Sequence, residues 1–137
     1  MSENSLPRLE RLRSLRAIRR LFSEGKSGFV YPFRYNVLTY TDEESAAAEP
    51  VAHDEDRSVK IMFSVPKRFH KRANKRNLLK RRMREAYRLN RSSLVGELKA
   101  RGIRADIALV YSTKECHSYK TVEHALQRIM EQVARNL

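Results

Sequence analysis

The chain has 137 residues, 41% of them hydrophobic, and its 29 Lys and Arg against 16 Asp and Glu give a formal net charge of +13. This length suits a single domain with one core, so we expect one domain over residues 1–137. The lone Cys116 excludes an internal disulfide, no run is long and apolar enough to cross a bilayer, and the N-terminus lacks the apolar region of a secretion signal. These features predict a cytoplasmic protein that has no membrane partner.

The N-terminal half predicts a helix and a strand. Residues 1–7 are polar and are expected to be flexible. Ser14 as N-cap and Gly25 as terminator bound a helix over residues 15–24. Residues 25–28 are expected to form a loop, and the aromatic and β-branched content of residues 33–40 predicts a strand. Seven acids in residues 41–57 predict a solvated acidic loop, either a competitor for a bound polyanion or an insertion without a role.

The C-terminal half predicts two strands and at least two helices. A strand over residues 59–66 ends at Pro66, and a basic stretch follows it. Residues 94–101 predict a short helical segment stopped by Gly102, and the apolar run 105–111 predicts a strand covered on both faces. Ser118 is the expected N-cap of a last amphipathic helix. The order α-β-β-α-β-α, with room for one more short strand, indicates an α+β or α/β sandwich.

Positive charge is concentrated in residues 67–91, which hold twelve Lys and Arg and a single acid, Glu85. This stretch therefore carries a net +11 of the chain's +13. Its second half has an apolar helical stripe of Leu79, Met83, Ala86 and Tyr87, with cations on the opposite side. Because like charges at this spacing repel one another, the pattern favours a polyanionic partner, and nucleic acid comes first.

The sequence offers no catalytic constellation of its own. The four histidines are scattered without metal-ligand spacing, and neither phosphate-binding glycine motif is present. Cys116 precedes His117, but adjacent side chains usually point in different directions, so a passive thiol is favoured. We therefore expect no catalytic residue and no metal ligand in the protein.

Aromatic residues give a second signal for nucleic acid. Five of them gather between the first helix and the first strand: Phe22, Phe29, Tyr31, Phe33 and Tyr35. Exposed rings stack on unpaired bases, whereas buried rings pack a core. On a strand, Phe33 and Tyr35 share one face, and Arg34 and Asn36 share the other. The sequence alone leaves open which face meets the core.

Residues 63–68, FSVPKR, and residues 73–88, ANKRNLLKRRMREAYR, resemble the signature of the bacterial ribonuclease P protein subunit. The resemblance extends to RLRSLRAIRRLFSEG as first helix, to RADIALVY as last strand and to the final helix. Leu78 stands where this family usually has a third basic residue.

The resemblance implies a fold and a function. The fold would be a single-domain α/β sandwich of order α-β-β-β-α-β-α with a left-handed β-α-β crossover. The protein would be the component of a ribonucleoprotein endoribonuclease that binds a catalytic RNA and removes the 5′ leader of precursor tRNA. It would be monomeric, and Mg²⁺ held mainly by the RNA would support hydrolysis.

The resemblance also implies two sets of site residues. The RNA-binding residues would be Lys67, Arg68, Arg72, Lys75, Arg76, Asn77, Lys80, Arg81, Arg84 and Arg88. A leader-binding cleft between the first helix and the sheet would be lined by Phe22, Phe33, Tyr35 and Ser64. The alternatives are a ribosomal or general structural RNA-binding protein and a basic protein bound to membrane surfaces, for which a bulky apolar helix face is lacking.

Overall fold

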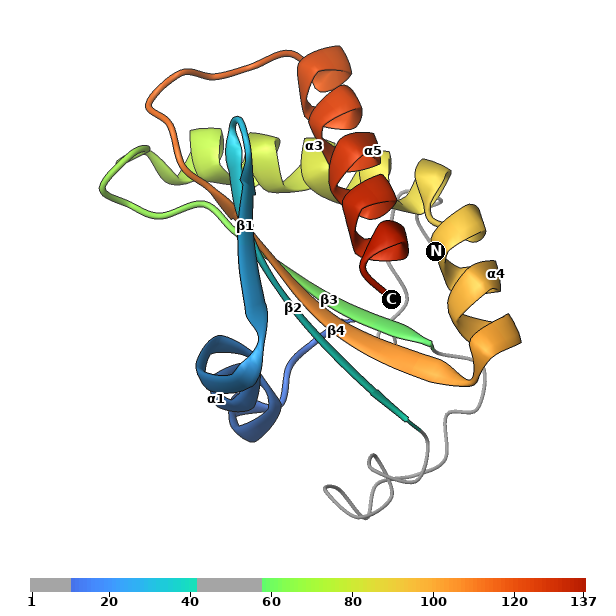
Figure 1. Ribbon diagram of the computed structural model, residues 1–137. Helices are drawn as coiled ribbons and strands as arrows, with labels where there is room; N and C mark the ends of the chain where they lie inside the picture. The colour runs from blue at the N-terminus through green and yellow to red at the C-terminus, as the bar shows by residue number, and fades with distance from the viewer. Residues whose placement is uncertain (1–10, 42–57) are drawn as a thin grey trace, which may run out of the picture.

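The computed structural model describes residues 11–41 and 58–137, so the N-terminal residues 1–7 and nearly all of the acidic segment lie outside the described residues. The elements run in the order α1 (Leu15–Glu24), β1 (Lys26–Val30), β2 (Phe33–Thr41), β3 (Val59–Ser64), α3 (Ala73–Asn90), α4 (Ser92–Arg101), β4 (Ile103–Tyr111) and α5 (Tyr119–Arg135) (Figure 1). The predicted α+β class is confirmed.

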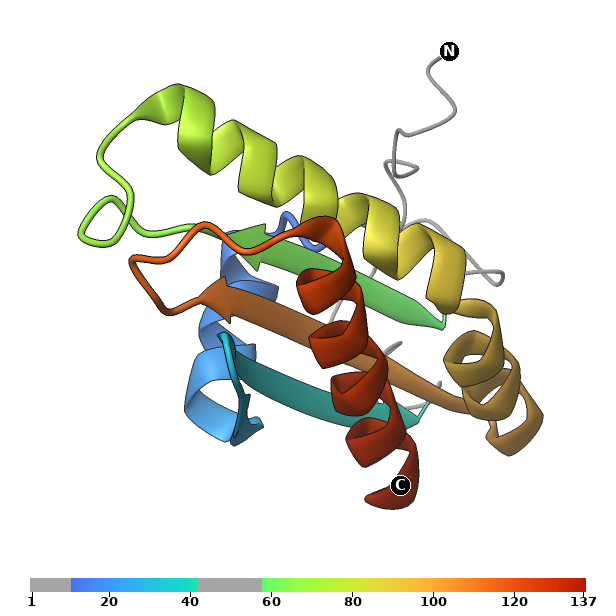
Figure 2. The same cartoon turned by 90° about the horizontal axis from the view of Figure 1, so that it is seen from above.

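The strands form one four-stranded sheet in the order β1-β2-β4-β3. All neighbours are antiparallel except β3 and β4, which are parallel. Helix α1 lies on one face, and α3, α4 and α5 cover the other (Figures 1 and 2). The chain passes from β3 to β4 through α3 and α4 on the second face, and the strand positions in Figure 2 make this crossover left-handed. It is therefore an exception to the strong right-handed preference, as predicted.

The predicted helix ends are confirmed by their hydrogen bonds. The Ser14 hydroxyl accepts from the Ala17 N–H at 3.3 Å, and the Gly25 N–H donates to the Leu21 carbonyl at 2.9 Å. The Ser118 hydroxyl caps α5 in the same way, accepting from the Thr121 N–H at 3.4 Å. Gly102 ends α4 in the left-handed conformation with φ of 67°, which glycine adopts at little cost.

The loop predicted over residues 25–28 is wrong, because strand β1 begins at Lys26. Lys, Ser and Gly are poor strand formers, so intrinsic propensity hides this strand. Gly28 is required by packing: a Cβ there would lie 2.3 Å from the Tyr35 ring. The first strand of the order implied by the family resemblance is therefore the short edge strand β1. Its glycine is required by the packing of the Tyr35 ring on the neighbouring strand β2.

The main core lies between the sheet and the helices α3, α4 and α5. Its largest fully buried side chains include Tyr87, Tyr111 and Phe33. A smaller cluster of Leu12, Leu21 and Ala108 joins α1 to the other face. Strand β4 lies between the two clusters and is buried on both faces, as predicted.

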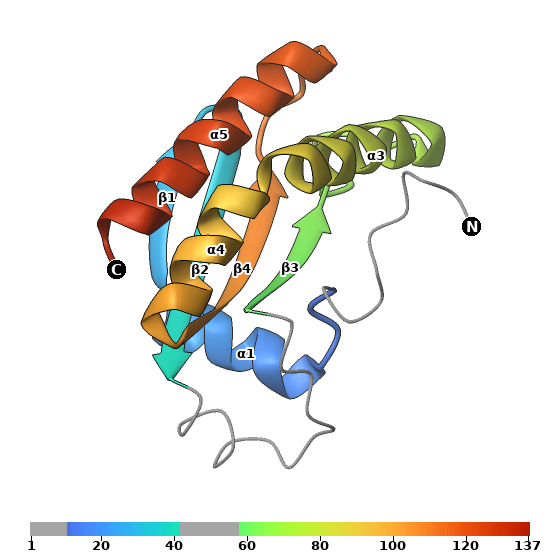
Figure 3. The ribbon, with the colours of Figure 1, turned by 90° about the vertical axis from the view of Figure 1, so that its right-hand side faces the viewer.

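Helix α1 crosses its sheet face at Ala108, in the middle of β4, and does not cover the whole face (Figure 3). The Arg20 guanidinium lies 5.5 Å from the centre of the Tyr40 ring near the end of β2, and Leu38 packs against the cluster that contains Leu21. The end of this face where β3 and β4 finish is left uncovered by α1.

Candidate nucleic-acid interface

Helix α3 displays cations at every fourth residue. Its apolar side is buried in the core through Leu79, Met83, Ala86 and Tyr87, as predicted. The next side of the helix carries what we call the basic stripe, Arg76, Lys80, Arg84 and Arg88, and Asn77 and Arg81 lie beside it. None of these six residues is buried. The apolar side therefore fixes the helix to the sheet, and its outer cations are accessible.

The loop over residues 66–72 places further cations next to the start of α3. Lys67, Arg68 and Arg72 are exposed in this loop, and Lys75 is exposed in the first turn of the helix. The loop begins with a turn in which the N–H groups of residues 69 and 70 both donate to the Pro66 carbonyl. All ten predicted RNA-binding residues thus lie in one continuous loop and helix.

Two side chains hold this loop in position. The Arg76 guanidinium donates to the His70 carbonyl at 3.0 Å and to the Lys71 carbonyl at 2.7 Å. The His70 ring is buried, lies 2.8 Å from the Thr113 carbonyl oxygen and packs against Tyr111. Arg76 is therefore both a surface cation and the anchor of the loop that carries the neighbouring cations.

Few of these cations are neutralised by the protein. Arg88 pairs with Glu85 at 2.7 Å. Within residues 11–41 and 58–137, no carboxylate pairs with six of the others: Lys67, Arg72, Lys75, Lys80, Arg81 and Arg84. Guanidinium groups that turned inward and paired with carboxylates would have contradicted the predicted RNA-binding surface. In the structure, these side chains lie at the surface.

Arg11, which the sequence analysis missed, extends this basic surface across the edge of the sheet. Its backbone forms a parallel bridge with Ile61 of β3, and Leu12 next to it points into the cluster under α1. Because neighbouring residues of an extended segment point to opposite faces, Arg11 points toward α3. Burial, followed by the charges of Arg11 and Arg81, lowers the pKa of Arg84. An anion bound among these three guanidiniums would relieve that repulsion.

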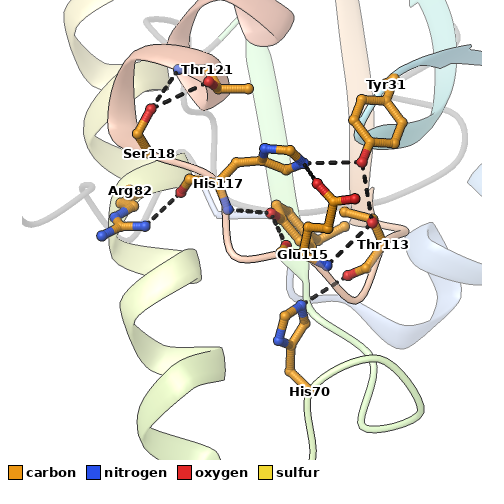
Figure 4. A network of polar contacts seen from close by, with 9 residues as sticks. Tyr31, His70, Arg82, Thr113, Glu115, His117, Ser118 and Thr121 are labelled. Carbon is orange, nitrogen blue, oxygen red and sulfur yellow. Dashed lines mark hydrogen bonds and ion pairs between the residues drawn. The ribbon is translucent and has the colours of Figure 1, made fainter.

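Arg82 was not among the predicted RNA-binding residues, and the structure gives it an internal partner. It lies on the other flank of α3 and donates to the His117 carbonyl at 2.5 Å (Figure 4). The His117 ring bonds Tyr31 at 3.1 Å and approaches Glu115 at 3.5 Å, whereas the exposed Cys116 thiol lies 3.7 Å from the Arg82 guanidinium. This geometry does not form a thiol–imidazole nucleophile.

The uncovered end of the α1 face presents four side chains in a row across all four strands. Ser64 of β3 pairs with Val110 of β4, Val110 with Arg34 of β2, and Arg34 with Phe29 of β1. We call this the Ser64 row. Arg34 and Phe29 are exposed, and Ser64 and Val110 are partly exposed. Arg34 has no hydrogen-bond or ion-pair partner within the described part of the chain.

Phe22 borders this row from α1. Successive helical residues are 100° apart, so Arg20 and Phe22 lie on opposite flanks of the sheet-facing Leu21. Since Arg20 lies over Tyr40, Phe22 lies on the flank toward the Ser64 row. Its side chain is 47% exposed. The structure therefore brings two of the four predicted leader-binding residues, Phe22 and Ser64, to one surface.

The prediction that Phe33 and Tyr35 line the same surface is wrong. Both point to the opposite face of β2, where Phe33 is fully buried against Tyr111 and Tyr35 is 9% exposed. The Tyr35 hydroxyl donates to the Gln132 side chain of α5 at 2.6 Å. Core packing claims these rings, and the α1 face of the strand carries Arg34 and Asn36 instead. The alternation of side chains along the strand placed Arg34 on the face opposite Phe33 and Tyr35. It did not indicate which of the two faces is exposed to solvent.

The described residues do not contain a cluster of three or more His, Cys, Asp or Glu side chains that could hold a metal ion. The part of the chain seen in the structure also lacks a helix with the length and apolar character needed to span a membrane. What the surface offers is therefore cations, one hydroxyl and exposed rings, a combination suited to binding nucleic acid.

Comparison with known proteins agrees with this surface chemistry. The family model described as Ribonuclease P matches residues 6–134. The chain is 37% identical over 132 residues to the "Ribonuclease P protein component" of Porphyromonas gingivalis, covering 96% of this chain and 88% of that protein.

Solved structures show the same fold. The ribonuclease P protein of Staphylococcus aureus superposes with a TM-score of 0.64 at 18% identity, covering 90% of this chain and 94% of the other. The ribonuclease P protein from Thermotoga maritima gives 0.60 at 24% identity, covering 90% and 96%. The chain therefore belongs to the bacterial ribonuclease P protein family, the protein components of the ribonucleoprotein endoribonuclease of tRNA processing.

Proposed function

We propose that the chain binds ribonuclease P RNA through the basic stripe and the loop over residues 66–72, and holds the 5′ leader of precursor tRNA on the Ser64 row beside Phe22. The observation that carries the proposal is the set of accessible, mostly unneutralised cations held on a rigid helix. The partnership with ribonuclease P RNA follows from the family. The residues that make the contact, and the leader as ligand, are the proposed part.

Phosphate binding follows from the geometry of α3. Guanidinium groups bind phosphate oxygens in a bidentate manner and release condensed counterions, which gives affinity without sequence reading. Burial lowers the pKa of Arg84, and the nearby charges of Arg11 and Arg81 lower it further. A phosphate among them would replace repulsion by attraction. The cations of the basic stripe are thus already close together in the protein without RNA.

The Ser64 row has the features of a single-strand site. Arg34 supplies a cation for a phosphate, and Ser64 supplies a hydroxyl that can donate or accept a hydrogen bond. The Phe22 and Phe29 rings, at its border and its far end, can stack on unpaired bases. A leader lying across the row would reach residues of four strands.

Hydrolysis in the assembled enzyme is proposed to depend on Mg²⁺ held mainly by the RNA subunit, because the described residues of this chain offer no ligand cluster for it. The protein's own part is to bind and orient the substrate. A monomeric protein located in the cytoplasm belongs to the same proposal.

The test is a reconstituted cleavage reaction with ribonuclease P RNA and precursor tRNA at low Mg²⁺. Adding the protein should raise the rate of 5′ maturation, and the complex should bind precursor tRNA more tightly than mature tRNA. A protein that binds the RNA without accelerating maturation would contradict the proposal and favour a general RNA-binding role.

The Arg81→Ala variant tests the surface itself. Removing one phosphate contact should weaken binding to ribonuclease P RNA and lower the slope of log affinity against log salt by about one. The matched control is Arg101→Ala, which removes the same charge from an exposed Arg that pairs with Glu97 on α4. If both variants change the slope equally, α3 has no special contact with the RNA.

A further inference from the structure

Two exposed aromatic side chains follow one another at the end of the Ser64 row: Phe29 is its last residue, and Tyr31 lies beyond it. Phe29 is 56% exposed and Tyr31 is 50% exposed, and their ring centres lie 6.4 Å apart in an edge-to-face arrangement. The His117 ring packs edge-on against Tyr31 at 5.3 Å. We call Phe29, Tyr31 and His117 the aromatic strip. It runs from the α1 face around the end of the sheet to the loop between β4 and α5.

The Tyr31 ring is held in place by its hydroxyl. The hydroxyl lies 3.1 Å from His117 Nε2 and 3.3 Å from the Thr113 hydroxyl (Figure 4). The turn after Tyr31 is tied to β4, because the Ser112 N–H donates to the Pro32 carbonyl at 2.8 Å. Without these polar contacts, an exposed ring could rotate. The contacts therefore fix the orientation of the Tyr31 ring.

His117 is fixed in turn by the buried Tyr111. Its N–H donates to the Tyr111 hydroxyl at 3.0 Å, and that hydroxyl donates to the Glu115 carbonyl at 2.6 Å. Arg82 donates to the His117 carbonyl from α3. The strip is therefore attached to two strands and a helix, and a ligand stacking on it would lose little further freedom from the protein.

The charges around the strip indicate what kind of ligand it takes. Arg34 is the cross-strand partner of Phe29, Lys114 is exposed in the adjoining loop, and Arg82 reaches the loop from α3. Glu115 is an acid of the same loop, and it lies against His117. Exposed rings flanked by cations favour single-stranded nucleic acid over an apolar protein surface, because bases stack on the rings while phosphates meet the cations.

We infer that the aromatic strip stacks on unpaired bases of the 5′ leader at the end of the Ser64 row and beyond it. This inference rests on the proposed function. The strip lengthens the single-strand path from four strands of the sheet to the loop between β4 and α5, with Phe29 and Tyr31 each able to take about one base.

The experiment uses the enzyme reconstituted with ribonuclease P RNA and a series of precursor tRNAs whose leaders grow one nucleotide at a time. Wild-type affinity should rise first as the leader covers the Ser64 row and again as it reaches the strip. The double variant Phe29→Ala/Tyr31→Ala should lose the second rise, about fivefold or more, and part of the first rise, because Phe29 also ends the Ser64 row. It should keep the affinities for the shortest leader and for mature tRNA.

Two further variants separate stacking from folding. Phe29→Tyr keeps a ring at the same place and should retain the second rise. Leu89→Ala removes a side chain of matched exposure, 55%, from the flank of α3 away from the basic stripe, and it should also retain the rise. Equal melting temperatures of the variants exclude loss of the fold as the cause.

The possible failures are distinguishable. If wild type binds precursor and mature tRNA equally, the proposed function fails. If wild type shows both rises and the double variant keeps them, the proposed function stands and the inference about the strip is overturned. If the double variant loses affinity for ribonuclease P RNA in the absence of tRNA, the strip belongs to the interface with the RNA subunit, which also overturns the inference.

Discussion

Single side chains in this protein serve the fold and the surface together, and Arg76 is the clearest case. Its two hydrogen bonds to the His70 and Lys71 carbonyls fix the loop that displays Lys67, Arg68 and Arg72. We expect Arg76→Ala to weaken binding to ribonuclease P RNA more than Arg81→Ala does, because it removes a charge and loosens its neighbours. Amide exchange in the loop should rise only in Arg76→Ala. Equal exchange in the two variants would remove the anchoring role.

Tyr111 is a second side chain that serves the fold and the surface together: it is buried in the core, and its hydroxyl holds His117. The ionisation of this hydroxyl gives a pH-dependent prediction. Burial raises the pKa of Tyr111 from 10.0 to about 12. Because the folded state favours the neutral phenol, its contribution to stability is complete below pH 10 and is lost as the pH rises toward 12. Denaturant unfolding measured across this range should show the decline.

Two comparisons check that assignment. Burial, with a hydrogen bond to Glu123, also raises the pKa of Tyr119 to about 12, so the double variant Tyr111→Phe/Tyr119→Phe should show the flattest dependence. Spectrophotometric titration of the folded protein should find fewer late-ionising phenols in the double variant than in the wild type. An unchanged titration curve in that variant would refute the assignment.

At the residue scale, the sequence predicted which stretch carries charge but not which side of β2 is solvated. Alternation separates Phe33 and Tyr35 from Arg34 and Asn36 with certainty. Both faces of this strand are covered in part by helices, so neither set is marked as the inner one by polarity alone. Only the packing of α5 on Phe33 and Tyr35 decides the question.

Among the secondary-structure elements, strand β1 depends most on contacts with its neighbours. Gly28→Ala would place a Cβ 2.3 Å from the Tyr35 ring, whose hydroxyl is bonded to Gln132. Moving that ring should destabilise the protein by about 1–3 kcal/mol. The matched control is Gly96→Ala in α4, where nothing lies within 4 Å of the new Cβ and a helical alanine should stabilise by about 0.5–1 kcal/mol.

Denaturant unfolding of the two glycine variants checks this contrast. Opposite signs are expected, with an unchanged denaturant dependence in both. If Gly28→Ala is as stable as wild type, Tyr35 moves without cost and its contact with α5 does not hold β1 in place.

Element boundaries were predictable where local chemistry sets them. Ser14, Ser118 and Gly102 mark helix ends through their own hydrogen bonds or backbone conformation, so the sequence placed α1, α4 and α5 within two residues. Strand β1 was missed because its residues are chosen by the Tyr35 ring and not by strand propensity. The left-handed crossover was expected from the family resemblance alone, since general rules of chirality predict the other hand.

Over the whole molecule, the charges are distributed unevenly, and this indicates the side from which RNA approaches. The groove between the end of α3, α4 and α5 is lined by Glu97 and Glu131 among polar and apolar residues. The basic stripe faces away from this groove, on the side of the β3 edge. Polyanions are therefore attracted most strongly to the side that carries the basic stripe.

This asymmetry predicts that the rate of association with RNA can change while the number of phosphate contacts stays the same. Glu131→Gln removes one negative charge, which raises the net charge of the protein by one without adding a phosphate contact. It should raise the association rate with ribonuclease P RNA slightly at low salt and leave the salt slope of the affinity unchanged. Stopped-flow binding at several salt concentrations measures both quantities. A changed slope would mean that RNA contacts the groove.

The bridge between Arg11 and Ile61 protects the protein from its own copies. The outer edge of β3 would otherwise display free backbone donors and acceptors, the template on which strands of neighbouring molecules aggregate. The Leu12 N–H bonds the Ile61 carbonyl at 2.9 Å, and the buried Leu12 side chain keeps the segment attached. A protease that trims the chain past Leu12 would thus remove Arg11, leave the cations of α3 in place and produce a protein prone to self-association.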